Sequence, residues 1–474
     1  MTASKPEQPD SPPKHLCIGA INPFALCEAI LGRKLDWNEP ATSSIMSSIL
    51  QTDYEELFDM RFHSILYAGI KMNDREDMAE PIPAKDMHTL TERDLVTPDF
   101  SRVEKLGDLG HMGLKDLNAI KVKHAFMSNG NLRLTLEPQS LGKTLCNSEM
   151  TTTLREIATP FRVNKKEPWT PPNSTWTDIG SCHRQDATMF NNPVQGATSN
   201  SWLIAAIMAV AWSDPSAIVH CSRSKSGSSG SPDHESREKQ RESYCSLSVK
   251  FHSKGGDNDA PTSTVTVNCE VPTNNSSSLL MYCRPSSMNM THPAMLRGWG
   301  GEIWPCLYEK AFAKWITKAE PDEEHPDITQ TCHGDPVKCM AQLADKEPQY
   351  FFTSHRRGHD LLGLVRMHCV NLRTIYPMVA FTHPTGDKFR GCTLVGNMAY
   401  TVLGWAAPQE RKQYIILRHP WGVTEPEGMT GYPGLVPVVD VKFWPPIELV
   451  DSMGVFAIET SAFKEYFAGL GVAK

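Results

Sequence analysis

The chain has 474 residues, of which 40% are hydrophobic and 21% charged, and its formal net charge is −7. This length suits two or three compact units, and the composition is that of an ordinary soluble globular protein. The acidic balance argues against a nucleic-acid partner, because phosphate binding needs a basic surface. No stretch of about 18 consecutive apolar residues occurs, so we expect no membrane span.

The 13 cysteines are scattered along the chain, odd in number and without CxxC spacing. This pattern is typical of reduced thiols in an intracellular protein, and not of a disulfide framework or a structural zinc site. Residues 1–14 are polar and proline-rich, which does not fit a signal peptide. We therefore expect a cytoplasmic protein that needs no metal or other cofactor.

The first third of the chain offers no chemical motif. Residues 1–15 predict a disordered tail, and residues 16–165 form an N-terminal extension. Within it, residues 43–66 carry apolar side chains at helical spacing. A structural role in packing is the expectation for this extension.

The remaining chain predicts a mainly helical unit followed by a β-rich unit. In the first, residues 166–345, we expect an extended linker at 167–176, an apolar helix at 202–212, a flexible charged insertion at 222–242, strands at 244–251 and 262–271, and a helix at 301–316. In the second, residues 346–474, strands are expected at 378–381, 399–403, 414–417 and 454–459. The predicted fold class is therefore α+β, with the two halves around a cleft.

Four sequence blocks stand out, in this order: Gln195-Gly-x-x-x-x-Ser201-Trp202, Trp304-x-x-Leu-x-Glu309-Lys-Ala-Phe-Ala-Lys314, Asn397-Met398-Ala-Tyr400 and His419-Pro-Trp421-Gly422. Together they resemble the catalytic core of the calpains, which have a papain-like fold. The resemblance covers about residues 170–470. It implies a papain-like core with an N-terminal extension.

The resemblance also implies roles for individual positions. Gln195 would donate to the oxyanion, and a cysteine at the start of a helix, where the dipole stabilises its thiolate, would be the nucleophile. This chain has Ser201 at the cysteine position, Met398 at the histidine position and His419 at the asparagine position. All three members of the triad are replaced, which predicts a pseudoprotease. Cleft residues retained beside them are Trp202, Asn397, Tyr400 and Trp421.

Calcium binding by a core of this kind is expected to be lost. Calpain cores bind calcium through carboxylates beside the catalytic blocks. Where the family pattern has Asp and Glu, this chain has Asn192 and Trp299. A tryptophan side chain offers no oxygen ligand, so a calcium-independent protein is predicted.

Three functions remain open for the altered cleft. The first is binding of an apolar small molecule, with the option of a non-hydrolytic cyclisation or cycloaddition, since a shaped pocket with a donor such as Gln195 or His419 can preorganise a substrate. The second is a regulatory scaffold that binds protein segments. The third is an atypical hydrolase in which His419 activates Ser201. Other candidates have blander interpretations: Cys182 and Cys392 as incidental thiols, and His355, His359 and Asp360 as a solvated loop and not a metal site.

Overall fold

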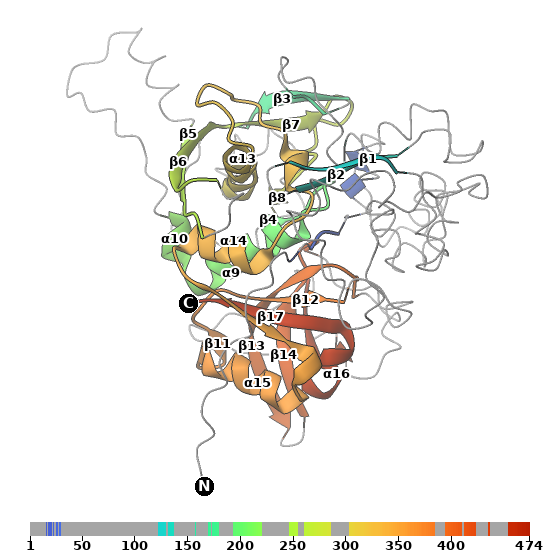
Figure 1. Cartoon of the computed structure of the whole chain (residues 1–474), viewed down its shortest axis with the longest axis vertical. Coiled ribbons are helices and arrows are strands. Elements are labelled where there is room, and N and C mark those ends of the chain that lie inside the picture. Colours follow the sequence, from blue (N-terminus) through green and yellow to red (C-terminus); the bar gives the residue numbers. More distant parts are fainter. Residues whose placement is uncertain are drawn as a thin grey trace, which may run out of the picture.

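The protein is described by a computed structural model. The described residues are 16, 18–20, 22, 25–26, 28–29, 122–128, 131–136, 157, 169–171, 173–179, 193–219, 246–254, 260–285, 303–383, 394–409, 412–422, 435–436 and 454–474. They form a mainly helical half and a half built on one large sheet, which lie above and below each other in Figure 1. The mixed helix and sheet content agrees with the predicted α+β class.

The helical half is organised around helix α9, Ser201–Ser213. Helix α9 carries no acidic residue in its first turn and no basic residue in its last, and residues 201–212 are all buried. A helix that is apolar on every side has to lie inside the protein. Around it lie α10 (Pro215–Val219), α13 (Trp304–Ile316) and α14 (Pro336–Ala344).

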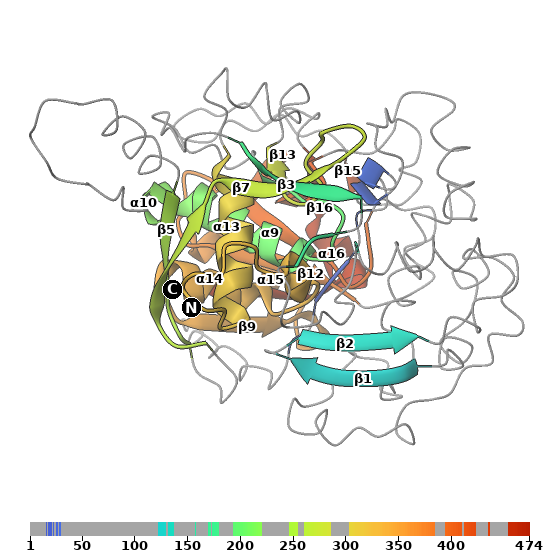
Figure 2. The ribbon, with the colours of Figure 1, turned by 90° about the horizontal axis from the view of Figure 1, so that it is seen from above.

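Short antiparallel strand pairs complete this half. The pairs are β3 (Ser174–Asp178) with β7 (Glu270–Asn274), β4 (Pro193–Val194) with β8 (Arg284–Pro285), and β5 (Ser246–Phe251) with β6 (Ser263–Asn268). The hairpin of β1 (Val122–Ser128) and β2 (Asn131–Leu136) lies to one side of α13 and α14 in Figure 2. The linker expected at 167–176 therefore ends in a strand, because its Thr-Trp-Thr run pairs with β7.

The second half is an antiparallel sheet in the order β15-β16-β14-β13-β12-β17-β9, with β11 paired to β13 and β10 to β11. In chain order these strands are β9 Pro348–Phe352, β10 Cys369–Val370, β11 Arg373–Thr374, β12 Met378–Thr382, β13 Ala399–Gln409, β14 Lys412–Arg418, β15 Leu435–Val436, β16 Val455–Glu459 and β17 Phe467–Ala473. Helices α15 (Gly358–Met367) and α16 (Thr460–Tyr466) pack on this sheet.

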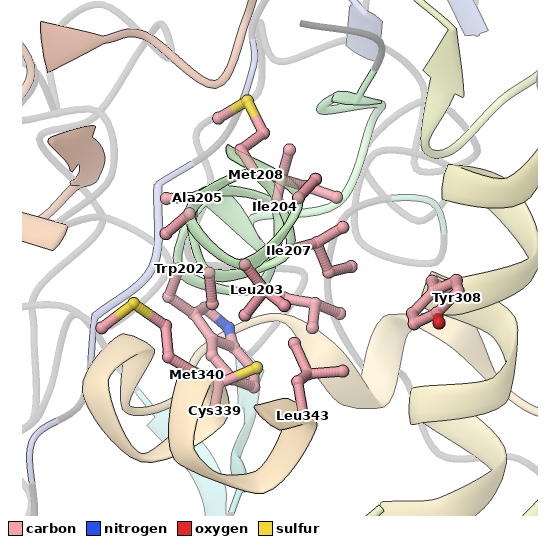
Figure 3. Packing of buried hydrophobic residues seen from close by; sticks show 14 of the residues in the cluster. Trp202, Leu203, Ile204, Ala205, Ile207, Met208, Tyr308, Cys339, Met340 and Leu343 are labelled. Carbon is pink, nitrogen blue, oxygen red and sulfur yellow. The ribbon is translucent and has the colours of Figure 1, made fainter. Parts of the chain in front are cut away.

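The two halves share one hydrophobic core, centred on α9. Helix α9 contacts β12 and β13 of the sheet as well as α13 and α14. In Figure 3, side chains of α9 such as Leu203 and Ile207 extend outward toward Leu343 of α14 and Tyr308 of α13. The N-terminus of α9 is consequently fixed at the junction of the halves.

Several predicted elements match the structure within a few residues, among them the helices at 202–212 and 301–316 and three of the four strands of the second half. The strand expected at 399–403 continues to Gln409, and the stretch expected as one strand at 262–271 forms β6 and β7. The loop expected at 355–360 is wrong in part, because α15 begins at Gly358 and Asp360 accepts from the Arg357 N–H as its cap. Predictions for residues 1–15, 43–66 and 222–242 fall outside the described residues. Among the described helices, none is long and apolar enough to cross a membrane.

Candidate functional site at the junction of the two halves

Ser201 is the first residue of α9 and is completely buried. Its Oγ has no hydrogen-bond partner among the described residues. An alcohol needs an adjacent base to become a nucleophile. The hydroxyl that the sequence places at a nucleophile position therefore has no activating base within hydrogen-bond distance among the described residues.

Asn200, directly before Ser201, ties the start of α9 to α13. Its Nδ2 donates to Glu309 Oε1 at 2.6 Å and to Thr331 Oγ1 at 3.0 Å. The other carboxyl oxygen of Glu309 accepts from the Cys283 backbone N–H at 2.9 Å. Burial raises the pKa of Glu309 to about 7, against the opposing effect of these two donors. Glu309 thus connects the start of α9 to the backbone at Cys283.

Gln195 connects the two halves through Trp421. The Trp421 indole Nε1 donates to Gln195 Oε1 at 3.1 Å, and the Gln195 N–H donates to the Pro420 carbonyl at 2.9 Å. The Gln195 amide group then has its Nε2 free to donate, and it reaches the carbonyls of Thr198, at 2.8 Å, and Ala20. Both acceptors are backbone carbonyl oxygens of the chain itself, and the predicted role of Gln195 toward a substrate oxyanion stays a prediction.

Met398 is the residue that the sequence predicts at the position of a general base. It is fully buried, and its backbone is held by Thr382, whose Oγ1 accepts from the Met398 N–H at 3.0 Å. The preceding Asn397 adopts the left-handed conformation, with φ of 54°. A thioether cannot take a proton from an alcohol at neutral pH, so no base exists at this position.

His419 is held by its neighbours and not by Ser201. Its Nδ1 accepts from the Trp421 backbone N–H at 3.1 Å, which places the proton of a neutral ring on Nε2. The ring packs edge-on against Tyr400, with centroids 5.1 Å apart, and against Trp421 at 4.6 Å. The interactions described for His419 orient it within the β-rich half.

Two of the predicted cleft residues support the walls of the site. Trp202 Nε1 donates to the Thr331 carbonyl at 2.8 Å, and the Tyr400 hydroxyl accepts from the Val395 N–H at 2.8 Å. Both side chains are buried. The structure therefore brings Gln195, Trp421, His419 and Tyr400 into one connected group, while Cys182, Cys392, Asn192 and Trp299 fall outside the described residues.

Sequence reasoning missed an N-terminal stretch that crosses this site. Gly19 donates its N–H to the Asn397 carbonyl at 3.1 Å and accepts from Asn397 Nδ2 at 3.0 Å. Ala20 donates its N–H to the Ser199 carbonyl at 3.1 Å. The signal that could have found this stretch is the short run of apolar and small residues, Leu-Cys-Ile-Gly-Ala-Ile, that follows a polar tail.

A thiol and an imidazole also meet near the site. Cys332 Sγ lies 2.9 Å from His333 Nδ1, and the Cys332 carbonyl accepts from Ser199 Oγ at 2.7 Å. Both side chains are buried, and burial lowers the pKa of His333 to about 3. The imidazole is therefore neutral, and a fully buried thiol is not open to a substrate.

One group among the described residues has metal-ligand geometry: Glu270, Glu324 and His325, whose ligand atoms lie within 4.8 Å of one another. His325 Nε2 already contacts Glu270 at 2.8 Å, and its ring stacks on Trp176 at 4.4 Å. The buried ammonium of Lys310 also interacts with both carboxylates. This group does not include His355 or His359, the histidines considered from the sequence. The exposed His359 contacts its neighbour Asp360 at 2.8 Å.

Comparison with known proteins agrees with a protease origin. The chain is 25% identical over 488 aligned positions to a protein of Porphyromonas gingivalis named "Thiol protease", and the alignment covers 98% of this chain and 88% of that protein. No family model matches the chain. This similarity over nearly the whole length points to a thiol-protease-like family for the chain.

Proposed function

We propose that this protein is a thiol-protease relative that does not cleave peptides, and that the groove between its two halves binds an extended polypeptide segment. The similarity to a thiol protease supports the ancestry of the groove. The calpain-like resemblance and the papain-like core belong to this proposal too.

Loss of hydrolysis is supported by the three replaced positions. Ser201 Oγ lacks a partner among the described residues, and Met398 cannot act as a base. His419, the imidazole that an atypical hydrolase would need, receives a hydrogen bond at Nδ1 from Trp421 and packs against Tyr400. This arrangement argues against a Ser201–His419 dyad.

Polypeptide binding is carried by one observation: an extended stretch, residues 18–20, pairs with backbone groups from both halves. Ile18 exchanges two backbone hydrogen bonds with Gly334, of 2.8 and 2.9 Å. Gly19 pairs with Asn397 of the β-rich half, and Ala20 with Ser199 of the helical half. Main-chain pairing of this kind suits an extended peptide, because the hydrogen bonds form with the peptide backbone and do not depend on a particular side chain.

The geometry favours this function over the small-molecule ligand expected first from the sequence. The groups that pair with residues 18–20 are backbone N–H and carbonyl groups and the Asn397 amide, which suit a peptide backbone better than an apolar molecule. Binding of a small molecule, cyclisation and cycloaddition stay predictions of the sequence, as does independence from calcium. Nothing in the described part of the chain favours them over a peptide.

Two assays test the proposal. Casein and fluorogenic peptides should remain intact when incubated with the purified protein, with or without calcium; cleavage that Ser201→Ala abolishes would contradict it. Selection from a library of displayed peptides should enrich extended sequences.

The binding site of the selected peptides is checked with a matched pair of variants. Asn397→Gly keeps a residue that tolerates positive φ but removes the side-chain donor to Gly19, so in a background whose own residues 18–20 are released by Ala20→Pro the affinity for an added peptide should fall at least about fivefold. Asn371→Gly makes the same change at an exposed asparagine with φ of 48°, and should leave affinity unchanged. Equal effects of the two substitutions would move the peptide site elsewhere.

A further inference from the structure

The backbone groups proposed to bind a peptide already have an occupant within the chain: the described residues of the segment 16–29, which are 16, 18–20, 22, 25–26 and 28–29. The pieces of this segment are drawn in blue in Figure 1, at and above the junction of the halves. Ile18 pairs antiparallel with Gly334, and Ala20 forms a parallel bridge with Asn200 at the start of α9. The segment lies more than 170 residues from these partners in sequence, so the contact is tertiary and not local.

The central carbonyl of the segment lies at the site's own donor. Gln195 Nε2 donates to the Ala20 carbonyl oxygen. The resemblance assigns this glutamine to the carbonyl under attack in a substrate. Ala20 consequently presents its carbonyl as a substrate would, next to a serine that cannot attack it.

A second set of contacts anchors the segment beyond the groove. Asn22 Nδ2 donates to the Gln195 carbonyl at 2.9 Å, while its own side-chain and backbone oxygens accept from the N–H groups of Ala25 and Leu26. This turn directs the chain to the helical half. There Glu28 forms an ion pair with Arg284, and the Ala29 carbonyl accepts from Asn274 Nδ2 at 2.7 Å.

Burial shows how completely the segment covers the site. Ile18 is 5% exposed and Ala20 is not exposed at all, and Gln195, Ser201 and Met398 beneath are also inaccessible. Glu28 and Arg284 are both largely buried, so their ion pair is shielded from screening by salt. With the segment in place, the Gln195 side chain is fully buried.

We propose that residues 16–29 are an intramolecular pseudosubstrate, which keeps the groove closed until a competing polypeptide displaces it. This inference rests on the proposed peptide-binding function and names both its regulation and its class of partner. The partner is an extended segment with the chemistry of residues 18–22. It has an apolar residue, then two small residues and, two positions after the second of these, an asparagine whose amide reaches the Gln195 carbonyl.

Effective concentration explains why the segment can control the groove without tight contacts. A ligand tethered in the same chain competes at an effective concentration in the millimolar range, so an external peptide of equal intrinsic affinity binds weakly. A substitution that loosens the tethered segment increases the fraction of molecules with a free site. The apparent affinity for an external peptide then rises in proportion to that fraction.

The first test measures occupation of the groove by hydrogen–deuterium exchange of the full-length protein. Ala20→Pro removes the N–H that Ser199 accepts, whereas the control Ala20→Gly keeps it. Gly334 is the reporter, because its N–H donates to Ile18 and belongs to the groove and not to the segment. Ala20→Pro should increase exchange at Gly334 and over residues 18–22 at least tenfold, with α9 unaffected.

The second test measures competition with a labelled synthetic peptide that has the sequence of residues 14–30, with its two cysteines replaced by serine. We expect it to bind the Ala20→Pro protein at least tenfold more tightly than the wild type or Ala20→Gly. A peptide that itself carries the proline should not bind. Glu28→Gln, which weakens the distant anchor at Arg284, provides a second released variant if Ala20→Pro fails to fold.

The outcomes separate the two proposals. Fast exchange at Gly334 in the wild type, or slow exchange in both released variants, would overturn the pseudosubstrate. Equal peptide affinity in the wild type and the released variants would also overturn it, while leaving the peptide-binding function intact. Released variants that exchange quickly but bind no peptide would refute the peptide-binding function itself.

Discussion

The indole of Trp421 donates a hydrogen bond of 3.1 Å to Oε1 of Gln195, and this bond decides which end of the Gln195 amide faces the groove. Because Oε1 is occupied, Nε2 is directed to the carbonyls of Ala20 and Thr198. A residue from the β-rich half thereby orients the donor of the helical half. The predictions below start from this relationship and from the residues that hold it.

Trp421→Phe should destabilise the protein and loosen the segment. It removes the indole donor and leaves the buried Gln195 oxygen unpaired, which typically costs about 1–3 kcal/mol of unfolding free energy. Chemical denaturation measures this cost. Exchange at Gly334 should rise as well, because a rotated Gln195 amide no longer binds Ala20.

Trp405→Phe is the matched control, since the ring of Trp405 packs beneath the Arg366 guanidinium, 4.5 Å away, and outside the groove. It should leave exchange at Gly334 unchanged. Identical behaviour of the two variants would show that the Trp421 indole does not orient Gln195.

The stability of the protein should fall as pH rises between about 4.5 and 7, through Glu309. Burial raises its pKa in the folded protein to about 7, while the unfolded carboxyl ionises near the ordinary value of 4.5. In this interval Glu309 is protonated in the folded state and ionised in the unfolded state, so the free energy of unfolding falls as pH rises. The stabilisation from the protonated carboxyl is fully present below pH 4.5 and is lost as pH rises through 7.

Glu309→Gln tests this assignment, because an amide does not ionise. The difference in unfolding free energy, wild type minus variant, should decrease by up to about 1.4 kcal/mol for each pH unit across this window. Denaturation curves at half-unit steps of pH measure it. A difference that is constant with pH would show that Glu309 is ionised in the folded protein throughout.

Gly196→Ala should destabilise the loop that precedes α9. A Cβ at this glycine would lie 2.2 Å from the backbone carbonyl carbon of Tyr282, which cannot move aside as a flexible side chain would. Overpacking of this kind costs typically about 1–3 kcal/mol, and a backbone clash belongs at the upper end.

Gly363→Ala is the control for the glycine prediction. Its Cβ would meet no atom within 4 Å, and the position lies inside helix α15, where alanine is favoured over glycine by about 1 kcal/mol. The melting temperature should therefore fall in the first variant and rise in the second. A rise in both would contradict the close approach of Gly196 to Tyr282.

Restoring the nucleophile alone should not restore proteolysis. In Ser201→Cys the residue predicted at the base position is still Met398, which cannot take a proton, and adding Met398→His leaves His419 where the calpain resemblance implies an asparagine that orients the base. Both variants should leave fluorogenic peptides intact. Cleavage by Ser201→Cys alone would indicate a base that the present assignment lacks.

The local patterns of the sequence determine much of the architecture. The apolar run at 202–212 predicts a buried helix, and α9 is that helix, because a segment with no polar side has only the core to occupy. The residues at the predicted triad positions, Ser201, Met398 and His419, can also be identified from the sequence, because residue type at a position requires no knowledge of the tertiary structure. What they do remains a prediction.

Only the tertiary structure decides what occupies the site. Residues 16–22 contain no catalytic motif, and their partners Gly334 and Asn397 lie hundreds of residues away, so no pattern of short period can reveal the pairing. The orientation of His419 toward Trp421 and Tyr400 likewise depends on which side chains fold against it. The periodicity of apolar residues indicates which side of a segment is buried. The pairing of residues 18–20 depends instead on backbone N–H and carbonyl groups, which every residue except proline has, and these groups come into register only when both halves have folded.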